Sequence, residues 1–121
     1  MEPHDDITIW FNPACSKSRA AAGLLAERGI EAGVFRYLDE APMRRQLEDL
    51  LVKLGTDDPL TITRATERSY VELGLDGADR DTLLDALVAH PNLIERPIVV
   101  RGGRAVVARP PERLAELLDN R

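Results

Sequence analysis

A lone cysteine directly follows a predicted strand, and this junction limits the folds that the chain can adopt. Residues 7–11 are mostly β-branched and aromatic, which predicts a strand, and Asn12-Pro13 breaks the run before Ser16. Cys15 therefore stands at or just before the start of a helix, where backbone N–H groups lack helical partners and the dipole is positive. Such a position lowers the pKa of a thiol and favours anion binding.

The cysteine count limits the redox chemistry of the chain. Cys15 is the only cysteine in 121 residues, so no internal disulfide can form. A redox-active Cys15 would need a second thiol from another molecule. The alternative is a buried structural cysteine, which is the commoner role of a lone one. The polar surroundings favour a functional thiol, since it lies among Asn12, Ser16, Lys17 and Ser18.

Composition argues against several classes of function. The chain has 16 Lys and Arg against 21 Asp and Glu, and this net charge of −5 argues against nucleic-acid binding. No apolar run approaches the roughly 20 residues that span a membrane. One cysteine and two histidines, His4 and His90, give no metal-ligand spacing. The unpaired thiol and an acidic N-terminus without an export signal predict a cytoplasmic protein.

The order of predicted elements indicates an α/β fold in one domain over residues 1–121. In chain order we expect a strand at 7–11, a helix at 16–28, a strand at 34–37, a helix at about 43–54, helical pieces over 56–90, strands at 97–100 and 105–108, and a last helix from Pro110. Gly102-Gly103 predicts a hairpin between the last two strands. This βαβα…ββα order is the layout of a thioredoxin-like fold, a four-stranded mixed sheet with a helical insertion at about 56–90.

Two arginines each precede a proline at the edge of a predicted element. Arg96-Pro97 comes just before the third strand, where thioredoxin-like folds place a cis proline beside the active cysteine. We therefore expect a cis Arg96–Pro97 peptide, although trans is the common form. Arg109-Pro110 precedes the last helix in a similar way.

In combination, these motifs resemble the glutaredoxin-coupled arsenate reductases over about residues 7–118. The resemblance is carried by Asn12-Pro13-Ala14-Cys15 with Ser18-Arg19, Tyr37-Leu38 followed by Pro42, residues 70–75, residues 90–100 and Arg109-Pro110. It implies a thioredoxin-like fold, arsenate as substrate, and glutathione and glutaredoxin as reductants, with no bound cofactor. Cys15 would be the nucleophile. The oxyanion would be bound by Arg64, Arg96 and Arg109.

Four further residues are expected to support this site, and one position departs from the family. Asn12 and Pro97 belong to the matching motifs, while Ser16 and Ser18 either donate to the sulfur or oxyanion or simply cap the helix. The best-known arsenate reductases carry a histidine where this chain has Phe11. We therefore expect the helix N-terminus and the arginines alone to lower the Cys15 pKa below about 8.5, the value of a free thiol.

Three other functions remain open at this point. A glutathione-dependent thiol oxidoreductase acting on another substrate would need Cys15 but tolerate loss of Arg64 or Arg109. An Spx-like regulator that binds RNA polymerase senses redox through Cys-x-x-Cys, whereas the second position is Ser18 here. A redox-inert scaffold would leave Cys15 no more reactive than a free thiol.

Overall fold

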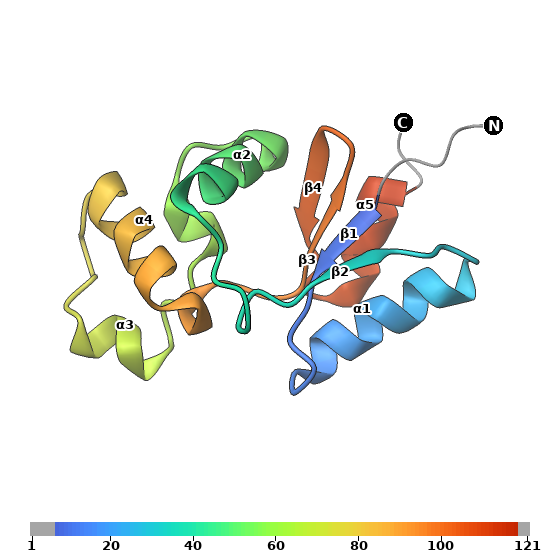
Figure 1. Ribbon diagram of the computed structural model, residues 1–121, viewed down its shortest axis with the longest axis horizontal. Coiled ribbons are helices and arrows are strands. Elements are labelled where there is room, and N and C mark those ends of the chain that lie inside the picture. Colours follow the sequence, from blue (N-terminus) through green and yellow to red (C-terminus); the bar gives the residue numbers. More distant parts are fainter. Residues whose placement is uncertain (1–6, 119–121) are drawn as a thin grey trace. The chain divides into compact units, whose positions relative to one another are not determined.

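The computed structural model describes residues 7–118, and its elements follow the predicted order (Figure 1). They are β1 (Ile7–Trp10), α1 (Ser16–Glu27), β2 (Gly33–Phe35), α2 (Arg44–Leu54), α3 (Arg68–Glu72), α4 (Arg80–Ala89), β3 (Ile98–Arg101), β4 (Arg104–Val107) and α5 (Leu114–Leu118), with short 3-10 turns at Pro59–Ile62, Pro91–Leu93 and Pro111–Arg113. The chain divides into two compact units, a sheet unit of Met1–Tyr37 with Arg96–Arg121 and a helical unit of Leu38–Glu95.

The sheet unit contains the predicted four-stranded mixed sheet. The strand order is β2-β1-β3-β4. β1 and β2 run parallel, whereas β1 with β3 and β3 with β4 are antiparallel. Gly102 has a φ of +58° at the predicted hairpin between β3 and β4, a conformation that glycine adopts at little cost. The thioredoxin-like fold expected from the sequence is therefore confirmed.

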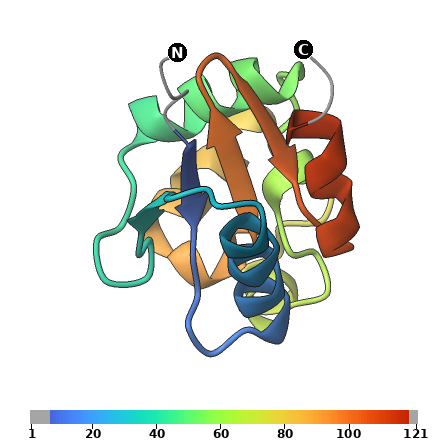
Figure 2. The same cartoon turned by 90° about the vertical axis from the view of Figure 1, so that its right-hand side faces the viewer.

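One face of this sheet is covered by α1 and α5, which lie on the same side of it (Figure 2). Alternate strand residues point toward the two helices, as the two-residue period of a strand requires. The resulting apolar cluster comprises Ile7, Ile9, Ala21, Leu25, Val99, Val106, Ala108, Leu114, Leu117 and Leu118. This core fixes the position of α1, and with it the position of Cys15 at the start of that helix.

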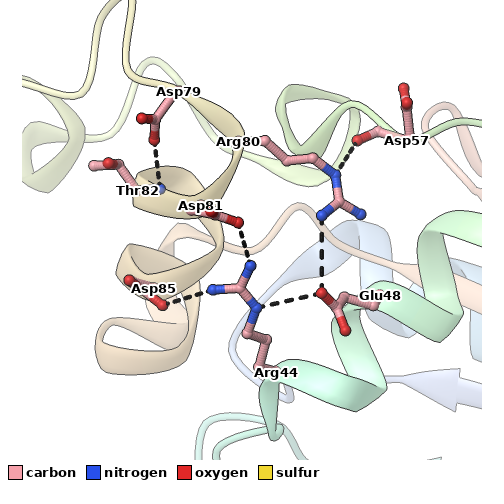
Figure 3. A network of polar contacts seen from close by, with 8 residues as sticks. All are labelled: Arg44, Glu48, Asp57, Asp79, Arg80, Asp81, Thr82 and Asp85. Atoms are coloured by element: carbon pink, nitrogen blue, oxygen red, sulfur yellow. Dashed lines mark hydrogen bonds and ion pairs between the residues drawn. The ribbon is translucent and has the colours of Figure 1, made fainter.

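The helical unit pairs α2 with α4 through buried leucines and an exterior charge network. Leu47, Leu50 and Leu51 of α2 are at most 2% exposed. Outside this core, the Arg44 guanidinium of α2 contacts the carboxylates of Glu48, Asp81 and Asp85 (Figure 3). Half-exposed pairs of this kind contribute little each, so burial of the leucines dominates the association.

The helical unit begins earlier than the predicted insertion. The sequence indicated an insertion at about 56–90, whereas the unit spans Leu38–Glu95 and includes α2. The apolar stripe of α2 predicts that one face of the helix is buried. It does not predict which element covers that face. Organisation as a single domain stays a prediction. No helix within residues 7–118 is long and apolar enough to cross a membrane.

Substitution by alanine should change the free energy of unfolding in opposite directions at two exposed glycines. Gly55 ends α2 with a φ of +80°, so Gly55→Ala should lower the free energy of unfolding by about 1–2 kcal/mol. Gly23 lies inside α1 with open space where an alanine methyl would stand, so Gly23→Ala should raise it by about 0.5–1 kcal/mol. Urea unfolding followed by circular dichroism measures both, and shifts of equal sign would contradict this account.

Candidate active site

A tight turn between β1 and α1 presents the cysteine. The Asn12 side-chain oxygen accepts from the Ala14 N–H at 2.9 Å, and the Cys15 N–H donates to the Asn12 carbonyl at 3.0 Å. The Asn12 N–H in turn donates to the Ser18 hydroxyl oxygen at 3.4 Å. Asn12 therefore shapes the turn through both its side chain and its backbone.

Cys15 occupies the N-cap position of α1, with an extended backbone (φ −98°, ψ 122°). The residue is only 8% exposed, so most of its surface is shielded from water. Its sulfur forms no capping hydrogen bond of regular geometry with the described backbone. The N–H groups of the first turn nonetheless lie close enough to act on a thiolate.

Several groups set the acidity of this thiol. Burial is the largest single effect and raises the pKa of Cys15. The backbone N–H groups of Ser18 and Lys17, followed by the charge and a hydrogen bond of Arg96, lower the pKa. Together these groups outweigh burial, so the pKa lies below its ordinary value, in the direction that the sequence predicts.

The register of β1 and β3 explains why Arg96 reaches the thiol. Trp10 at the end of β1 lies opposite Ile98 at the start of β3. Asn12 follows Trp10 by two residues and Arg96 precedes Ile98 by two, so this register brings the cysteine turn and Arg96 to the same end of the sheet. The Arg96–Pro97 peptide is cis, as predicted, and Pro97 is buried. Arg96 is partly buried beside the sulfur and supplies the positive charge that acts on it.

Arg109 is brought next to Arg96 by the β3–β4 pairing. The Ala108 N–H donates to the Pro97 carbonyl at 2.9 Å, and Arg109 Nη1 donates to the Arg96 carbonyl at 3.2 Å. Its side chain is exposed. The Arg109–Pro110 peptide is also cis, which the sequence analysis did not predict. Two of the three predicted arginines thus lie together, one of them directly at the thiol.

With this geometry in place, comparison with known proteins identifies the family. A model of the ArsC family matches residues 10–117. The chain belongs to the ArsC family. An arsenate reductase of Neisseria meningitidis serogroup A is 48% identical over 93% of this chain and 98% of its own length. The uncharacterized Escherichia coli protein YfgD is 40% identical over 93% and 96%. The solved structure of an arsenate reductase from Vibrio cholerae is 40% identical, covers 94% and 98%, and superposes with a TM-score of 0.90.

The third predicted arginine of this ArsC-family chain, Arg64, belongs to the helical unit. Its Nη1 donates to the Asn92 carbonyl at 3.2 Å, and its Nη2 lies 3.0 Å from the carboxylate of Glu67. A place for Arg64 in an oxyanion site stays a prediction. No sequence pattern distinguishes Glu67, because a glutamate three residues after an arginine is a common surface pattern.

The remaining predicted residues divide by burial. Ser18 is fully buried and its hydroxyl holds the Asn12 N–H, whereas Ser16 is exposed at the first position of α1. Phe11 packs against the apolar cluster on the sheet face that α1 and α5 cover. His4 lies outside the described residues, and no cluster of His, Cys, Asp and Glu suited to a metal ion occurs within residues 7–118.

Arg19 belongs to the motif that carries the resemblance, but its contact in the site was not predicted from the sequence. Its Nη1 donates to the Pro13 carbonyl at 2.8 Å, so the exposed guanidinium braces the turn from the first turn of the helix. The sequence offered no signal for this contact, because arginines are frequent in the chain and the partner is a backbone atom. The brace joins the two ends of the segment that carries Cys15.

The contribution of Arg96 to the acidity of Cys15 can be measured directly. Arg96→Gln removes a charge that lowers the Cys15 pKa, so the midpoint of alkylation rate against pH should move to higher pH. At pH values above both midpoints the variant should react at least as fast as the parent, because a thiolate of higher pKa is the stronger nucleophile. Alkylation by iodoacetamide, a neutral reagent, avoids direct attraction to the arginine.

A matched control removes the same charge elsewhere in the sheet unit. Arg104 is exposed at the hairpin end of β4, where it donates to the Glu116 carbonyl at 2.9 Å. Arg104→Gln should leave the alkylation midpoint in place. An unchanged midpoint in Arg96→Gln, or equal shifts in both variants, would contradict a specific effect of Arg96.

Proposed function

We propose that this ArsC-family chain is an arsenate reductase whose nucleophile is the Cys15 thiolate. The observation that carries the proposal is a thiol of lowered pKa at the start of α1, with Arg96 beside it. A thiolate, not a thiol, is the attacking species in such chemistry. Relatives that carry the name arsenate reductase at 48% identity support the choice of substrate.

Electrostatics explains why arginines accompany the thiol. Arsenate is an anion at neutral pH, so an approaching thiolate is repelled by a few kcal/mol at contact distance in a partly screened site. The guanidinium groups of Arg96 and Arg109, together with the N–H groups of the first turn of α1, offset this repulsion. Arginine suits a tetrahedral oxyanion because its planar fork donates two parallel hydrogen bonds. We assign Arg64 to the same anion on the family pattern.

The first chemical step forms a sulfur–arsenic bond. The Cys15 thiolate attacks the arsenic(V) atom of the dihydrogen arsenate anion. One arsenate hydroxyl takes up the proton that Cys15 released and leaves as water. The product is a covalent adduct in which arsenic is bonded to the Cys15 sulfur and keeps its other three oxygens, one proton and a single negative charge. Arsenic keeps its oxidation state in this step.

The second step reduces arsenic and requires an external thiol. Glutathione attacks the Cys15 sulfur, a sulfur–sulfur bond forms, and the electron pair of the sulfur–arsenic bond passes to arsenic. Arsenic(III) leaves as the dihydrogen arsenite anion, carrying the adduct's proton and the proton of the glutathione thiol. Cys15 remains as a mixed disulfide with glutathione, because the chain has no second cysteine to close an internal one.

We propose that glutaredoxin then restores the thiol. Its thiolate attacks the glutathione sulfur of the mixed disulfide, which releases Cys15 and leaves glutathione on glutaredoxin. These donors belong to a reducing cytoplasm, where we place the reaction. Nothing in this cycle requires a bound cofactor, since glutathione enters as a co-substrate.

Loss of the nucleophile should abolish the activity. Cys15→Ser removes the thiolate but preserves nearly the same shape, so arsenite formation should fall to background in an assay coupled to glutathione, glutaredoxin and NADPH. An unchanged circular dichroism spectrum serves as the control for folding. Arsenite production by Cys15→Ser above the enzyme-free rate would refute the proposed mechanism.

The arginines should affect arsenate more than they affect the thiol donors. A hydrogen bond to a charged group contributes about 1.5–3 kcal/mol, so Arg96→Gln or Arg109→Gln should lower kcat/KM for arsenate about tenfold to a hundredfold. The dependence on glutathione should change far less. A chain that reduces mixed disulfides normally but never reduces arsenate would instead be an oxidoreductase of another substrate.

A further inference from the structure

Glu67 directs its carboxylate to an arginine and not to the helix that follows. The residue is the N-cap of α3, and its carboxylate forms no capping hydrogen bond with the described backbone. Instead, Glu67 Oε2 lies 3.0 Å from Nη2 of Arg64. The carboxylate thus forms an ion pair with Arg64 and does not accept from the backbone N–H groups of the first turn of α3.

Arg64 is held firmly on its other sides. Its backbone N–H donates to the Leu93 carbonyl at 2.7 Å, and Nη1 donates to the Asn92 carbonyl at 3.2 Å. The side chain is only 21% exposed, and that of Glu67 only 29%. A guanidinium with so little water around it is costly to leave without a counter-charge, and Glu67 supplies that charge in the absence of any anion.

We propose that Glu67 is an internal competitor for the anion on Arg64 and thereby sets how tightly the oxyanion binds. This inference rests on the proposed function, in which Arg64 contacts the oxyanion. An incoming oxyanion must either displace the carboxylate from Nη2 or bind beside it, and in both cases the negative charge of Glu67 opposes binding. Glu67 therefore tunes the affinity for the oxyanion and acts through Arg64, without touching the arsenic.

Glu67→Gln separates charge from position. The glutamine amide oxygen can still accept a hydrogen bond from Nη2 of Arg64, so the guanidinium keeps its anchor while the opposing charge disappears. Partly exposed ion pairs are worth up to about 1 kcal/mol, which converts to about a twofold to fivefold tighter Kd for arsenate. Calorimetric titration of arsenate into a chain that also carries Cys15→Ser measures binding without turnover.

Glu48 provides a matched control in the same unit. It is a glutamate of the charge network in Figure 3, 3.3 Å from Arg44 and 3.8 Å from Arg80. Glu48→Gln makes the same change in net charge and should leave the Kd for arsenate unchanged. An equal gain in Glu48→Gln would mean that overall charge causes the effect, and would overturn the proposal.

A double-mutant cycle tests whether the effect passes through Arg64. In an Arg64→Gln background, Glu67→Gln should tighten binding less than it does in the chain with Arg64, because no guanidinium remains to compete for. Unchanged or weaker binding in Glu67→Gln, with an unaltered melting temperature, would overturn the proposal. So would an Arg64→Gln variant that binds arsenate as tightly as its Cys15→Ser parent.

The test is independent of the reaction itself. If the chain with Cys15 intact forms arsenite in the coupled assay while Glu67→Gln leaves the Kd unchanged, this inference fails and the proposed function stands. If no arsenite forms and arsenate does not bind the Cys15→Ser chain, the proposed function fails, and the assignment of Glu67 fails with it.

Discussion

The antiparallel pairing of β1 with β3 is the interaction on which the candidate site depends. Trp10 opposes Ile98, and Ile98 opposes Val107 on the next strand. Continued two residues past these pairs, the same register aligns Asn12 with Arg96 and Arg96 with Arg109. Segments from the two ends of the sequence therefore meet at one end of the strands. The cysteine turn and the two arginines come together because three strands end side by side.

The same register is fixed by the apolar core, so stability and site geometry have a common cause. Ile9 and Val99 form a directly opposed pair, as do Val99 and Val106, and all three belong to the cluster under α1 and α5. A slip of one residue would turn these side chains to the other face of the sheet. Burial of valines and isoleucines thus resists the displacement that would separate Arg96 from the thiol.

Local features of the site and the layout of the sheet could be predicted from sequence, whereas individual side-chain contacts between distant segments could not. The placement of Cys15 at the start of α1 followed from the change from strand to helix pattern around Asn12-Pro13. The cis form of Arg96–Pro97 was predictable only once a thioredoxin-like layout was assumed. Two features escaped sequence reasoning for identifiable reasons. The contact of Arg109 with the Arg96 carbonyl lies two residues past the last pair of β3 and β4, so the hairpin register that Gly102-Gly103 sets does not by itself predict it. The inclusion of α2 in the helical unit does not follow from its stripe of leucines, which indicates a buried face but not the element that it packs against.

The N-termini of α4 and α1 differ in how their free backbone N–H groups are satisfied. At the start of α4, Asp79 accepts from the Thr82 N–H at 2.8 Å, an ordinary cap in which a side-chain oxygen satisfies a free backbone donor. At α1 the equivalent position is held by Cys15, a residue that caps helices poorly, so the N–H groups of Lys17 and Ser18 remain directed toward the sulfur. The first turn also carries Lys17 and Arg19, positive charges that oppose the helix dipole instead of complementing it. Each of these choices disfavours the isolated helix, and each favours a thiolate or an oxyanion at its N-terminus. The N–H groups that no side chain caps at the start of α1 are therefore the same groups that lower the pKa of Cys15.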